Sequence, residues 1–414
     1  MESFFKTHTY LVEHMTASVR RTLMDEIDWN DRLIGIKGSR GIGKTTFLLQ
    51  YAKENFGPRD RRCLYVNMNN FYFQGRGIAD FASDFAAQGG KVLLIDQIFK
   101  KPDWSNELRT CYNQCPNLKI VFTGSSVMRL KEENPELKDI VKSYNLRGFS
   151  FREYVNLQTG NNFPVLSLND IIRRHAEIAA EITSKADIAT LFGEYLHHGF
   201  YPFFLEHRNF EENLLKTMNM MTEVDILFIK QIELKYLTKI KKLFYLLAVE
   251  GPKAPNISNL AQEIETSRAT VMNYIKYLSD ARLINIMYHP GDDFPKKPSK
   301  VMMHNPNLMY TIYPYIADTQ EVMETFLVNA LWKDHIVNQG KQDACYIIDN
   351  MRKLKVVDYA KSLKLRNNAD TTYAVYNTTE GGNGRVPLWM FGMTYYTSRS
   401  EEGSAGMTRP ISYA

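Results

Sequence analysis

A glycine-rich run near the N-terminus ends in a lysine and two threonines. It reads Gly38-Ser39-Arg40-Gly41-Ile42-Gly43-Lys44-Thr45-Thr46. The spacing satisfies G-x-x-x-x-G-K-[ST], in which glycines let successive backbone N–H groups turn inward around an anion. The lysine of such a loop reaches the β- and γ-phosphates, and the first threonine hydroxyl can ligate Mg²⁺. We therefore expect the whole run to bind a nucleoside triphosphate.

An acidic residue ends the apolar run Lys91-Val-Leu-Leu-Ile-Asp96, which follows Gly89-Gly90. The run predicts a buried strand that brings Asp96 to its C-terminal end, where a carboxylate can hold Mg²⁺. Apolar residues before an aspartate are common by chance, but here they follow a complete phosphate-binding loop. Thr45 and Asp96 are therefore the predicted metal ligands.

The elements that position these residues are also readable. Leu33 to Ile36 predicts a buried strand before the loop, and Lys44 to about Asn55 predicts an amphipathic helix after it. Further strands are expected at 63–67, 91–96 and 119–123. Strands that alternate with helices indicate an α/β fold with a parallel sheet.

Length and composition indicate several globular domains. The chain has 414 residues, of which 44% are hydrophobic and 23% charged, which is typical of globular proteins. No apolar run approaches the ~20 residues that cross a bilayer, and the N-terminus has no signal-peptide pattern. With only four cysteines, we expect a cytoplasmic protein without a membrane partner. A net charge of +5 permits nucleic-acid contact without requiring it.

The order of four motifs resembles a known family. They are the glycine loop, Leu93-Leu-Ile-Asp96 with Gln97, Phe122-Thr-Gly-Ser-Ser126, and Leu146-Arg-Gly-Phe-Ser-Phe-Arg-Glu-Tyr154. Together they resemble a prokaryotic AAA+-like P-loop ATPase family, related to the archaeal ATPases and more distantly to origin-recognition initiators. The resemblance runs from Trp29 to about Tyr396. It implies ATP and Mg²⁺ as ligands, a winged helix, and a C-terminal domain like the restriction endonucleases.

Gln97 stands where ATPases of the additional-strand type usually carry a glutamate that polarises water. An amide orients water but cannot accept its proton, and general-base catalysis contributes roughly 10²–10⁴-fold. Three interpretations are open. An engineered exchange of a native glutamate would trap ATP unhydrolysed, and we favour this one because the other motifs are intact. A native glutamine would position water, as in small GTPases. The third is a natural ATP-binding switch that turns over slowly.

Polar and basic residues after the strand at 119–123 complete the predicted site. Ser125 fits a sensor of the γ-phosphate, with an ordinary polar strand end as the alternative. Arg147, with Arg129 in reserve, is the candidate that acts on the γ-phosphate of a neighbouring subunit; a surface salt bridge is the alternative. Action in trans would imply a homo-oligomer in the ATP state.

A helix-turn-helix pattern follows the helical lid that we expect at 161–235. Two short helices at 257–264 and 267–278 are joined by Glu265-Thr266, and a strand and a Pro/Gly/Lys-rich wing follow. We interpret this as a winged helix that binds double-stranded DNA, with protein packing as the alternative. The predicted contacts come from the second helix and, through phosphates, from the wing: Arg268, Thr270, Asn273, Lys276, Lys296, Lys297 and Lys300.

The last domain has acids, but not in the pattern of an active nuclease. Glu324 and Asp349 could be the first two acids of a Mg²⁺ site. The acid-x-Lys pair is missing, because Asp358 and Lys361 are separated by two residues. We therefore expect a degenerate scaffold that binds DNA or a partner.

The pattern as a whole predicts an α/β P-loop NTPase of the additional-strand type that acts as an ATP-dependent switch. Alternatives are an ATP-regulated DNA-processing nuclease and a nucleotide-regulated interaction module, in defence or toxin control, with an unknown protein partner. The expected domains are an ATPase core at 1–160, a helical lid at 161–235, a winged helix at 236–305, a nuclease-like domain at 306–397 and a disordered tail at 398–414.

Overall fold

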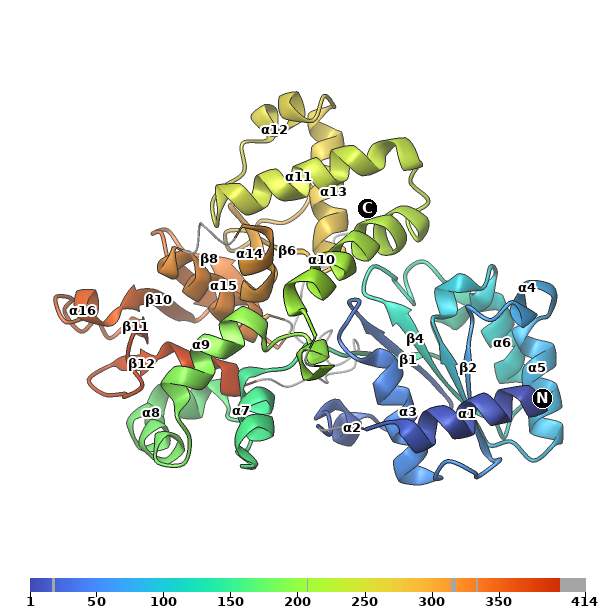
Figure 1. The fold of residues 1–414 in the computed structure, drawn as a ribbon. Helices are drawn as coiled ribbons and strands as arrows, with labels where there is room; N and C mark the ends of the chain where they lie inside the picture. Colours follow the sequence, from blue (N-terminus) through green and yellow to red (C-terminus); the bar gives the residue numbers. More distant parts are fainter. Residues whose placement is uncertain (17–18, 207, 314–317, 333, 395–414) are drawn as a thin grey trace. The chain divides into compact units, whose positions relative to one another are not determined.

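The computed structural model describes residues 1–16, 19–206, 208–313, 318–332 and 334–394. The predicted tail at 398–414 lies outside these residues. The described chain forms two compact units, Met1–Arg147 and Gly148–Tyr396 (Figure 1). Within the described ranges, no helix combines the length and the apolar character needed to cross a bilayer.

The first unit is built on a five-stranded parallel sheet in the order β2-β3-β4-β1-β5. Its strands are β1 (Leu33–Gly38), β2 (Cys63–Asn67), β3 (Val92–Asp96), β4 (Lys119–Ser125) and β5 (Lys142–Asn145). Strands buried on both faces explain the continuous apolar runs. The four predicted strands are confirmed. The fifth, β5, was not predicted because its residues include no apolar run.

Helices flank this sheet. They are α1 (Glu2–His14), α2 (Leu23–Glu26), α3 (Lys44–Asn55), α4 (Tyr72–Gly75), α5 (Ile78–Ala87) and α6 (Trp104–Gln114), with short 3₁₀ turns η1 (Ile98–Lys100) and η2 (Pro135–Leu137). The first helix buries Phe4, His8 and Val12, one turn apart on one face, and it contacts both β2 and α3. The predicted helix from Lys44 to Asn55 is confirmed.

The second unit begins with a series of helices. They are α7 (Phe151–Thr159), α8 (Leu168–Thr183), α9 (Ile188–His198), η3 (Pro202–Glu206), α10 (Phe210–Met220), the π-helix η4 (Met221–Phe228) and η5 (Leu234–Tyr236). A capping box starts α7, since the Ser150 hydroxyl accepts the Glu153 N–H and the Glu153 carboxylate accepts the Ser150 N–H.

Helices α7 to α9 share a core with the C-terminal end of the chain. The Phe151 ring of α7 packs edge-to-face against Phe192 of α9 and against Trp389. Phe192 in turn contacts Phe326. This aromatic core holds α7 in the second unit, and the two compact units divide after Arg147. The predicted ATPase core at 1–160 includes α7, and its end at 160 stays a prediction.

Three helices and a hairpin follow. They are α11 (Leu237–Glu250), α12 (Ile257–Glu263), α13 (Arg268–Asp280) and the antiparallel strands β6 (Ile284–Met287) and β7 (Lys300–Met303). Ser267 caps α13 by accepting the Thr270 N–H at 3.1 Å. The assignment of these elements to a winged helix stays a prediction.

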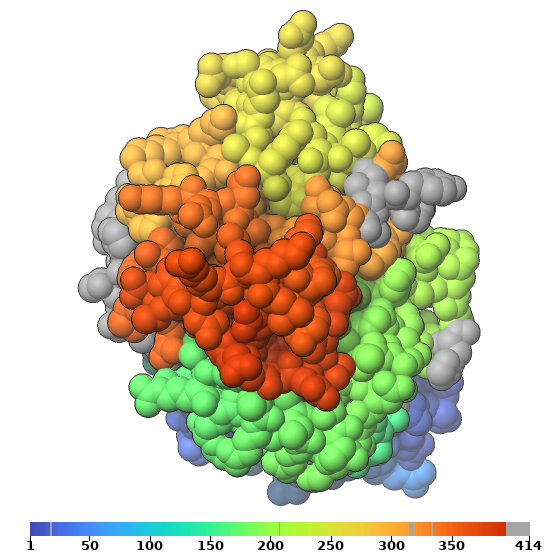
Figure 2. Space-filling view, turned by 90° about the vertical axis from the view of Figure 1, so that its left-hand side faces the viewer, coloured from blue at the N-terminus to red at the C-terminus, as the bar shows by residue number. Residues whose placement is uncertain are grey.

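The C-terminal sheet has the order β12-β11-β10-β9-β8. Its elements are α14 (Pro306–Ile312), α15 (Thr319–Leu331), β8 (Val337–Gln339), β9 (Cys345–Ile348), β10 (Arg352–Asp358), α16 (Tyr359–Ser362), β11 (Thr371–Tyr376), β12 (Arg385–Pro387) and η6 (Leu388–Met393). Strand β10 is antiparallel to β9 and parallel to β11. The region of this sheet, orange to red in Figure 2, lies open toward the viewer.

Candidate functional site

The loop between β1 and α3 has the backbone that the glycine pattern predicts. Gly41 and Gly43 have φ values of +83° and +91°, a region that glycine enters without the steric cost of a Cβ. A Cβ on Gly38 would lie 2.4 Å from Ile42 Cδ1 and 2.6 Å from the Leu146 carbonyl oxygen. Gly43 immediately precedes α3, so the loop ends at a helix N-terminus, which favours anions.

Lys44 lies across this loop. Its ammonium donates to the carbonyl oxygens of Gly38 at 2.9 Å and Ser39 at 2.7 Å. The side chain therefore folds back over the residues that would surround a phosphate. Thr45 and Thr46, the next two residues of α3, are exposed.

Arg21 supports the loop from outside the motif. Its buried guanidinium donates to the carbonyl oxygens of Ile42 at 3.1 Å and Arg147 at 2.5 Å. It thereby ties the loop to the end of β5. A basic pair at 20–21 was visible in the sequence, but no motif assigned it a role.

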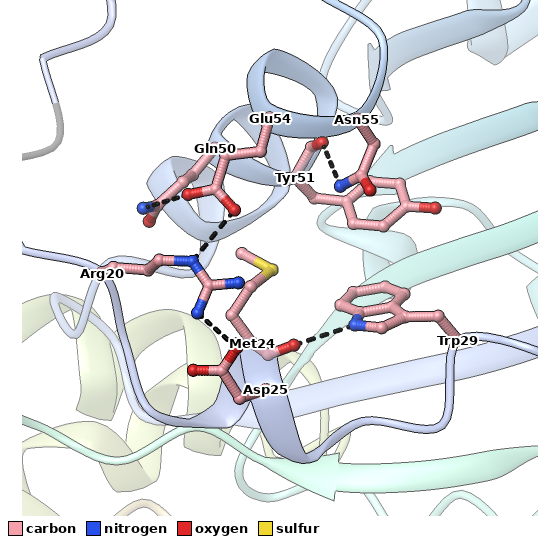
Figure 3. A network of polar contacts seen from close by, with 8 residues as sticks. All are labelled: Arg20, Met24, Asp25, Trp29, Gln50, Tyr51, Glu54 and Asn55. Carbon is pink, nitrogen blue, oxygen red and sulfur yellow. Dashed lines mark hydrogen bonds and ion pairs between the residues drawn. The ribbon is translucent and has the colours of Figure 1, made fainter.

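The neighbouring Arg20 attaches the same segment to α3 (Figure 3). It contacts Asp25 at 2.5 Å and Glu54 at 3.1 Å. Trp29 stacks on Tyr51 of α3 with ring centroids 4.2 Å apart. These contacts hold the segment before β1 on the helix that begins at Lys44.

Asp96 is the centre of a hydroxyl cluster at the end of β3, and it is 1% exposed. One carboxylate oxygen accepts the Thr45 hydroxyl at 2.6 Å and the Tyr65 hydroxyl at 2.8 Å. The other accepts the Thr123 hydroxyl and the Gln97 N–H. The predicted pair Thr45 and Asp96 is thus in direct contact, and burial beside the carboxylate raises the pKa of Tyr65.

Tyr65 and Thr123 were not predicted as site residues. Tyr65 lies on β2, beside β3 in the sheet, and Thr123 lies on β4, on the other side of β3. Because parallel neighbours end at the same edge, polar residues near those ends were the available signal. Ser125, the predicted sensor, lies opposite Gly38 in the β1–β4 register and is 2% exposed. Thr123, not Ser125, contacts Asp96.

Gln97 has a left-handed backbone, with φ +55° and ψ +53°. Its N–H donates to the Thr123 hydroxyl at 2.9 Å, and its side-chain oxygen accepts the Asn69 amide at 3.1 Å. The side chain is therefore oriented toward the loop after β2. This geometry suits each of the three interpretations of Gln97, and all three stay open.

The two arginines predicted to act on the γ-phosphate of a neighbouring subunit differ in exposure. Arg147 is 5% exposed, whereas an arginine that acts on a neighbouring subunit must present its guanidinium at a surface. The role of Arg147 toward a neighbouring subunit stays a prediction. Arg129, the reserve, is half-buried.

The predicted DNA contacts on α13 and the wing are mostly accessible. Arg268, Asn273 and Lys297 are exposed. Thr270 and Lys276 are half-buried, and the Lys276 ammonium lies 4.6 Å from the centre of the Phe294 ring. Lys296 contacts Asp292 at 2.5 Å, which raises the pKa of the lysine.

The position of Lys300 corrects one of the predicted DNA contacts. It was predicted to meet phosphates from the wing, but it is 5% exposed and donates to the Glu324 carboxylate at 3.1 Å. The residue is in β7, where strand pairing and the neighbouring α15 enclose it. A lysine in this position neutralises a buried acid and cannot reach DNA.

The C-terminal acids do not assemble into a nuclease centre. Glu324 accepts from Lys300, Tyr346 and Gln320. Asp349 accepts from His335 at 2.7 Å and from the Ile336 N–H at 2.9 Å.

Asp358 caps α16 by accepting the Ala360 N–H. Each of the three acids thus has its own set of partners. In the part of the chain that the structure describes, no group of three His, Cys, Asp or Glu residues could hold a metal ion.

Comparison with known proteins finds two matching families. Residues 30–155 match the model of an AAA domain, and residues 189–305 match a domain of unknown function. Residues 30–155 are therefore similar to an AAA domain, and the parallel five-stranded sheet gives this region an α/β fold. ATP and Mg²⁺ are the general ligands of such domains.

Two curated proteins of Methanocaldococcus jannaschii are similar over much of the chain. Uncharacterized protein MJ1637 is 28% identical over 295 residues, which span 67% of this chain and 61% of that protein. Uncharacterized protein MJ1544 is 23% identical over 276 residues, which span 61% of this chain and 55% of that protein. The chain therefore aligns with less than two thirds of either relative.

Three solved structures align at low similarity. Aeropyrum pernix ORC1 in complex with DNA gives a TM-score of 0.29 at 13% identity, covering 77% of this chain and 94% of that one. C. elegans PCH-2 gives 0.23 at 14%, covering 67% of each chain. A Thermotoga maritima DNA polymerase III gamma subunit-related protein gives 0.26 at 12%, covering 67% and 97%. TM-scores this low do not establish a shared fold over the whole chain.

Proposed function

We propose that this protein is an ATP-dependent switch whose first unit binds ATP with Mg²⁺ and hydrolyses it slowly. The observation that carries the proposal is the juxtaposition of three groups. Lys44 lies over the glycine loop, and Thr45 directly contacts Asp96 at 2.6 Å. A lysine, a hydroxyl and a carboxylate at the edge of a phosphate-binding loop are the groups that a bound triphosphate requires.

The roles of the residues follow from their positions. The backbone of residues 38–46 would bind the phosphates, and Lys44 would exchange its bonds to the loop carbonyls for phosphate oxygens. The Tyr65 and Thr123 hydroxyls would orient the Asp96 carboxylate. Ser125 keeps its proposed place as a polar residue beside the loop, because it lies opposite Gly38.

Thr45 and Asp96 fit a magnesium ion. Both offer oxygen atoms, which Mg²⁺ prefers, and the contacts described for Asp96 are all with neutral donors. When bound, the ion would supply positive charge to the phosphates. The chain itself would hold the Asp96 carboxylate in place through four donated hydrogen bonds.

Removal of Lys44 tests the nucleotide site. Lys44→Ala should abolish ATP binding, measured by titration with a fluorescent ATP analogue, because the loop loses its phosphate-binding cation. Lys53→Ala is the matched control, since Lys53 belongs to the same helix near its other end and donates to the Met15 carbonyl oxygen. Unchanged affinity in Lys44→Ala would refute the assignment of the site.

A second comparison tests the slow turnover. Gln97→Glu should raise the ATPase rate by roughly 10²–10⁴-fold, because a carboxylate can accept the proton of the attacking water. Equal rates would exclude the engineered-trap interpretation and favour a native glutamine or a slow switch. Size-exclusion chromatography of both proteins with ATP tests the homo-oligomer.

DNA association is the second part of the proposal. It is supported by exposed Arg268 and Asn273 on α13, next to the β6–β7 hairpin. Arg268→Ala and Lys297→Ala should weaken a gel shift with duplex DNA, and the loss should depend on salt. Full retention of the shift in both variants would instead favour the alternative of a protein partner for this region.

A further inference from the structure

A second region of the chain carries an unusual concentration of positive charge. Residues 351–376 contain six lysines and arginines and only two acids, a net charge of +4 where the entire chain has +5. The six cations are Arg352, Lys353, Lys355, Lys361, Lys364 and Arg366. Four of them, at 353, 361, 364 and 366, are exposed.

These cations make few contacts with acids, although the Arg352 charge helps to lower the pKa of Asp349. Among the residues that the structure describes, none of the six is in an ion pair. The Arg352 guanidinium bonds the neutral Asn169 amide oxygen at 3.1 Å. Of the two acids in the segment, Asp358 already accepts from the Ala360 N–H and the Asn377 amide. The segment therefore keeps a net positive charge, with four of its six cations exposed.

The sheet places Lys353 and Lys355 on one face. Along β10, Leu354 and Val356 are buried and this strand contacts α15, so the alternate residues Lys353 and Lys355 lie on the opposite face. Val357, which shares that opposite face, packs with Tyr373, Val375 and Leu365.

Leu365 fixes the rest of the segment over the same face. It lies between Lys364 and Arg366, so its packing on the cluster brings both cations to this side of the sheet. Arg385 of β12 donates to the carbonyl oxygens of Ser362 and Leu365, and the Tyr373 hydroxyl donates to that of Arg366. The cations are thus presented from an anchored backbone.

Apolar side chains interleave with these cations. Tyr359 and Leu363 are 41% and 59% exposed, although burial is the usual state of such side chains. Exposed aromatic and aliphatic groups between cations suit sugars and bases next to phosphates. In Figure 2, atoms of the surrounding region, in orange and red, lie on the side turned to the viewer.

From these observations we propose that the face of the C-terminal sheet formed by residues 353–366 binds the phosphate backbone of nucleic acid. We call it the basic face. This inference extends the proposed DNA association to a surface separate from α13. A membrane surface is the less favoured occupant, because α16 has only four residues and offers no amphipathic helix for a bilayer.

The test measures duplex binding by the full chain. Lys361→Gln/Lys364→Gln/Arg366→Gln is compared with the unaltered protein by fluorescence anisotropy on a duplex of about 20 base pairs, from about 50 to about 200 mM NaCl. The slope of log Kd against log salt should fall by about 3, since each phosphate contact contributes about 0.9. An unchanged slope would overturn the proposal.

A matched variant separates local contacts from net charge. Lys6→Gln/Lys91→Gln/Arg173→Gln removes three exposed cations elsewhere and changes the net charge equally. It should leave the slope within about one unit of the original value. If the salt slope falls equally in both triple variants, overall charge explains the effect and the proposal is overturned.

Two further measurements distinguish DNA from a membrane as the partner, and the basic face from α13 as the binding surface. If the basic-face variant loses binding to phosphatidylcholine vesicles with about one third phosphatidylserine, but keeps its DNA affinity, the occupant is a membrane and the proposal fails. If Arg268→Ala/Asn273→Ala abolishes DNA binding and the basic-face variant does not weaken it, this inference fails while the proposed role of α13 stands. If only the basic-face variant loses DNA binding, the inference is supported and the proposed DNA-binding role of α13 fails.

Discussion

Two buried carboxylates, one in each unit, have opposite surroundings. Asp96 in the first unit is 1% exposed, and among the described residues its carboxylate accepts from three hydroxyls and one N–H, all of them neutral donors. Glu324 in the second unit is 6% exposed and pairs with the Lys300 ammonium. Asp96 was predicted to hold Mg²⁺, whereas Glu324 was named only as a possible first acid of a nuclease-like domain expected to be degenerate.

The difference shows what decides whether a buried carboxylate can still bind a cation. Neutral donors stabilise a carboxylate while its charge stays uncompensated, so a cation can still gain from binding there. A lysine at 3.1 Å supplies the compensating charge permanently. This difference supports the proposed Mg²⁺-binding role of Asp96, whereas the Lys300–Glu324 pair is an internal contact of the second unit.

The largest expected effect comes from breaking the ion pair between Lys300 and Glu324 in the second unit. Lys300→Met should lower the free energy of unfolding by about 3–5 kcal/mol, because it leaves Glu324 buried without a counter-charge. Urea denaturation of the full chain measures this loss. Lys353→Met, at an exposed position, is the control and should be neutral.

A double variant distinguishes charge from packing at the same site. Lys300→Met/Glu324→Gln should recover much of the lost stability, because no unpaired charge then remains. If the double variant is as unstable as the single one, the lysine stabilises mainly through its packed stem, and the contrast with Asp96 is weaker.

The next effect concerns acid stability in the first unit. His8 accepts the Tyr65 N–H at 3.0 Å, and burial lowers the pKa of His8 to about 4. Between pH 6.5 and 4 the unfolded chain therefore binds one more proton than the folded chain. Stability should fall through this window as the pH falls, by up to about 3 kcal/mol.

His8→Gln should flatten that loss in urea denaturations at pH 7, 5 and 4. The control is His14→Gln, at an exposed position of the same helix. Equal pH sensitivity in His8→Gln and the unaltered chain would show that this histidine does not control the acid response of the strand that carries Tyr65.

Nucleotide binding should separate the two carboxylates directly. Asp96→Asn should weaken Mg²⁺-dependent ATP binding by about 10–100-fold, by analogy with the loss of groups that support a metal. Glu324→Gln should not change it. Titrations with Mg²⁺ and with a chelator distinguish a loss of metal support from a general loss of nucleotide affinity, which would contradict the role of Asp96.

The smallest expected effect tests the hydroxyls around Asp96. Tyr65→Phe removes one of four donors, so the free energy of unfolding should fall by about 1 kcal/mol. Mg²⁺-dependent ATP affinity should fall less than in Asp96→Asn. An unchanged ratio between the affinities with and without Mg²⁺ would show that Tyr65 supports the fold and not the position of the carboxylate.

Much of the first unit could be predicted because its signals are local. The glycine positions follow from the backbone angles of one loop, and the strands ending at Asp96 and near Thr123 follow from continuous apolar runs. The helix that begins at Lys44 follows from its contact with that loop. The contact between Thr45 and Asp96 was predictable as well, because both residues lie where a strand or loop meets the same sheet edge.

The second unit shows where such reasoning ends. Lys300 follows a stretch rich in proline and lysine, and its local context indicates solvent. Only the pairing of β6 with β7 beside α15 buries it against Glu324, which lies in a separate helix. Whether a lysine meets DNA or an internal acid depends on that packing.

The sequence by itself determined that a phosphate-binding loop and an acidic strand end are present, because short-range spacing and backbone geometry suffice for both. The tertiary structure alone decided which polar residues surround each acid. It put Thr123 rather than Ser125 on Asp96 and gave Glu324 a lysine. These outcomes depend on strand order, register and burial, and each joins residues that are far apart in the chain.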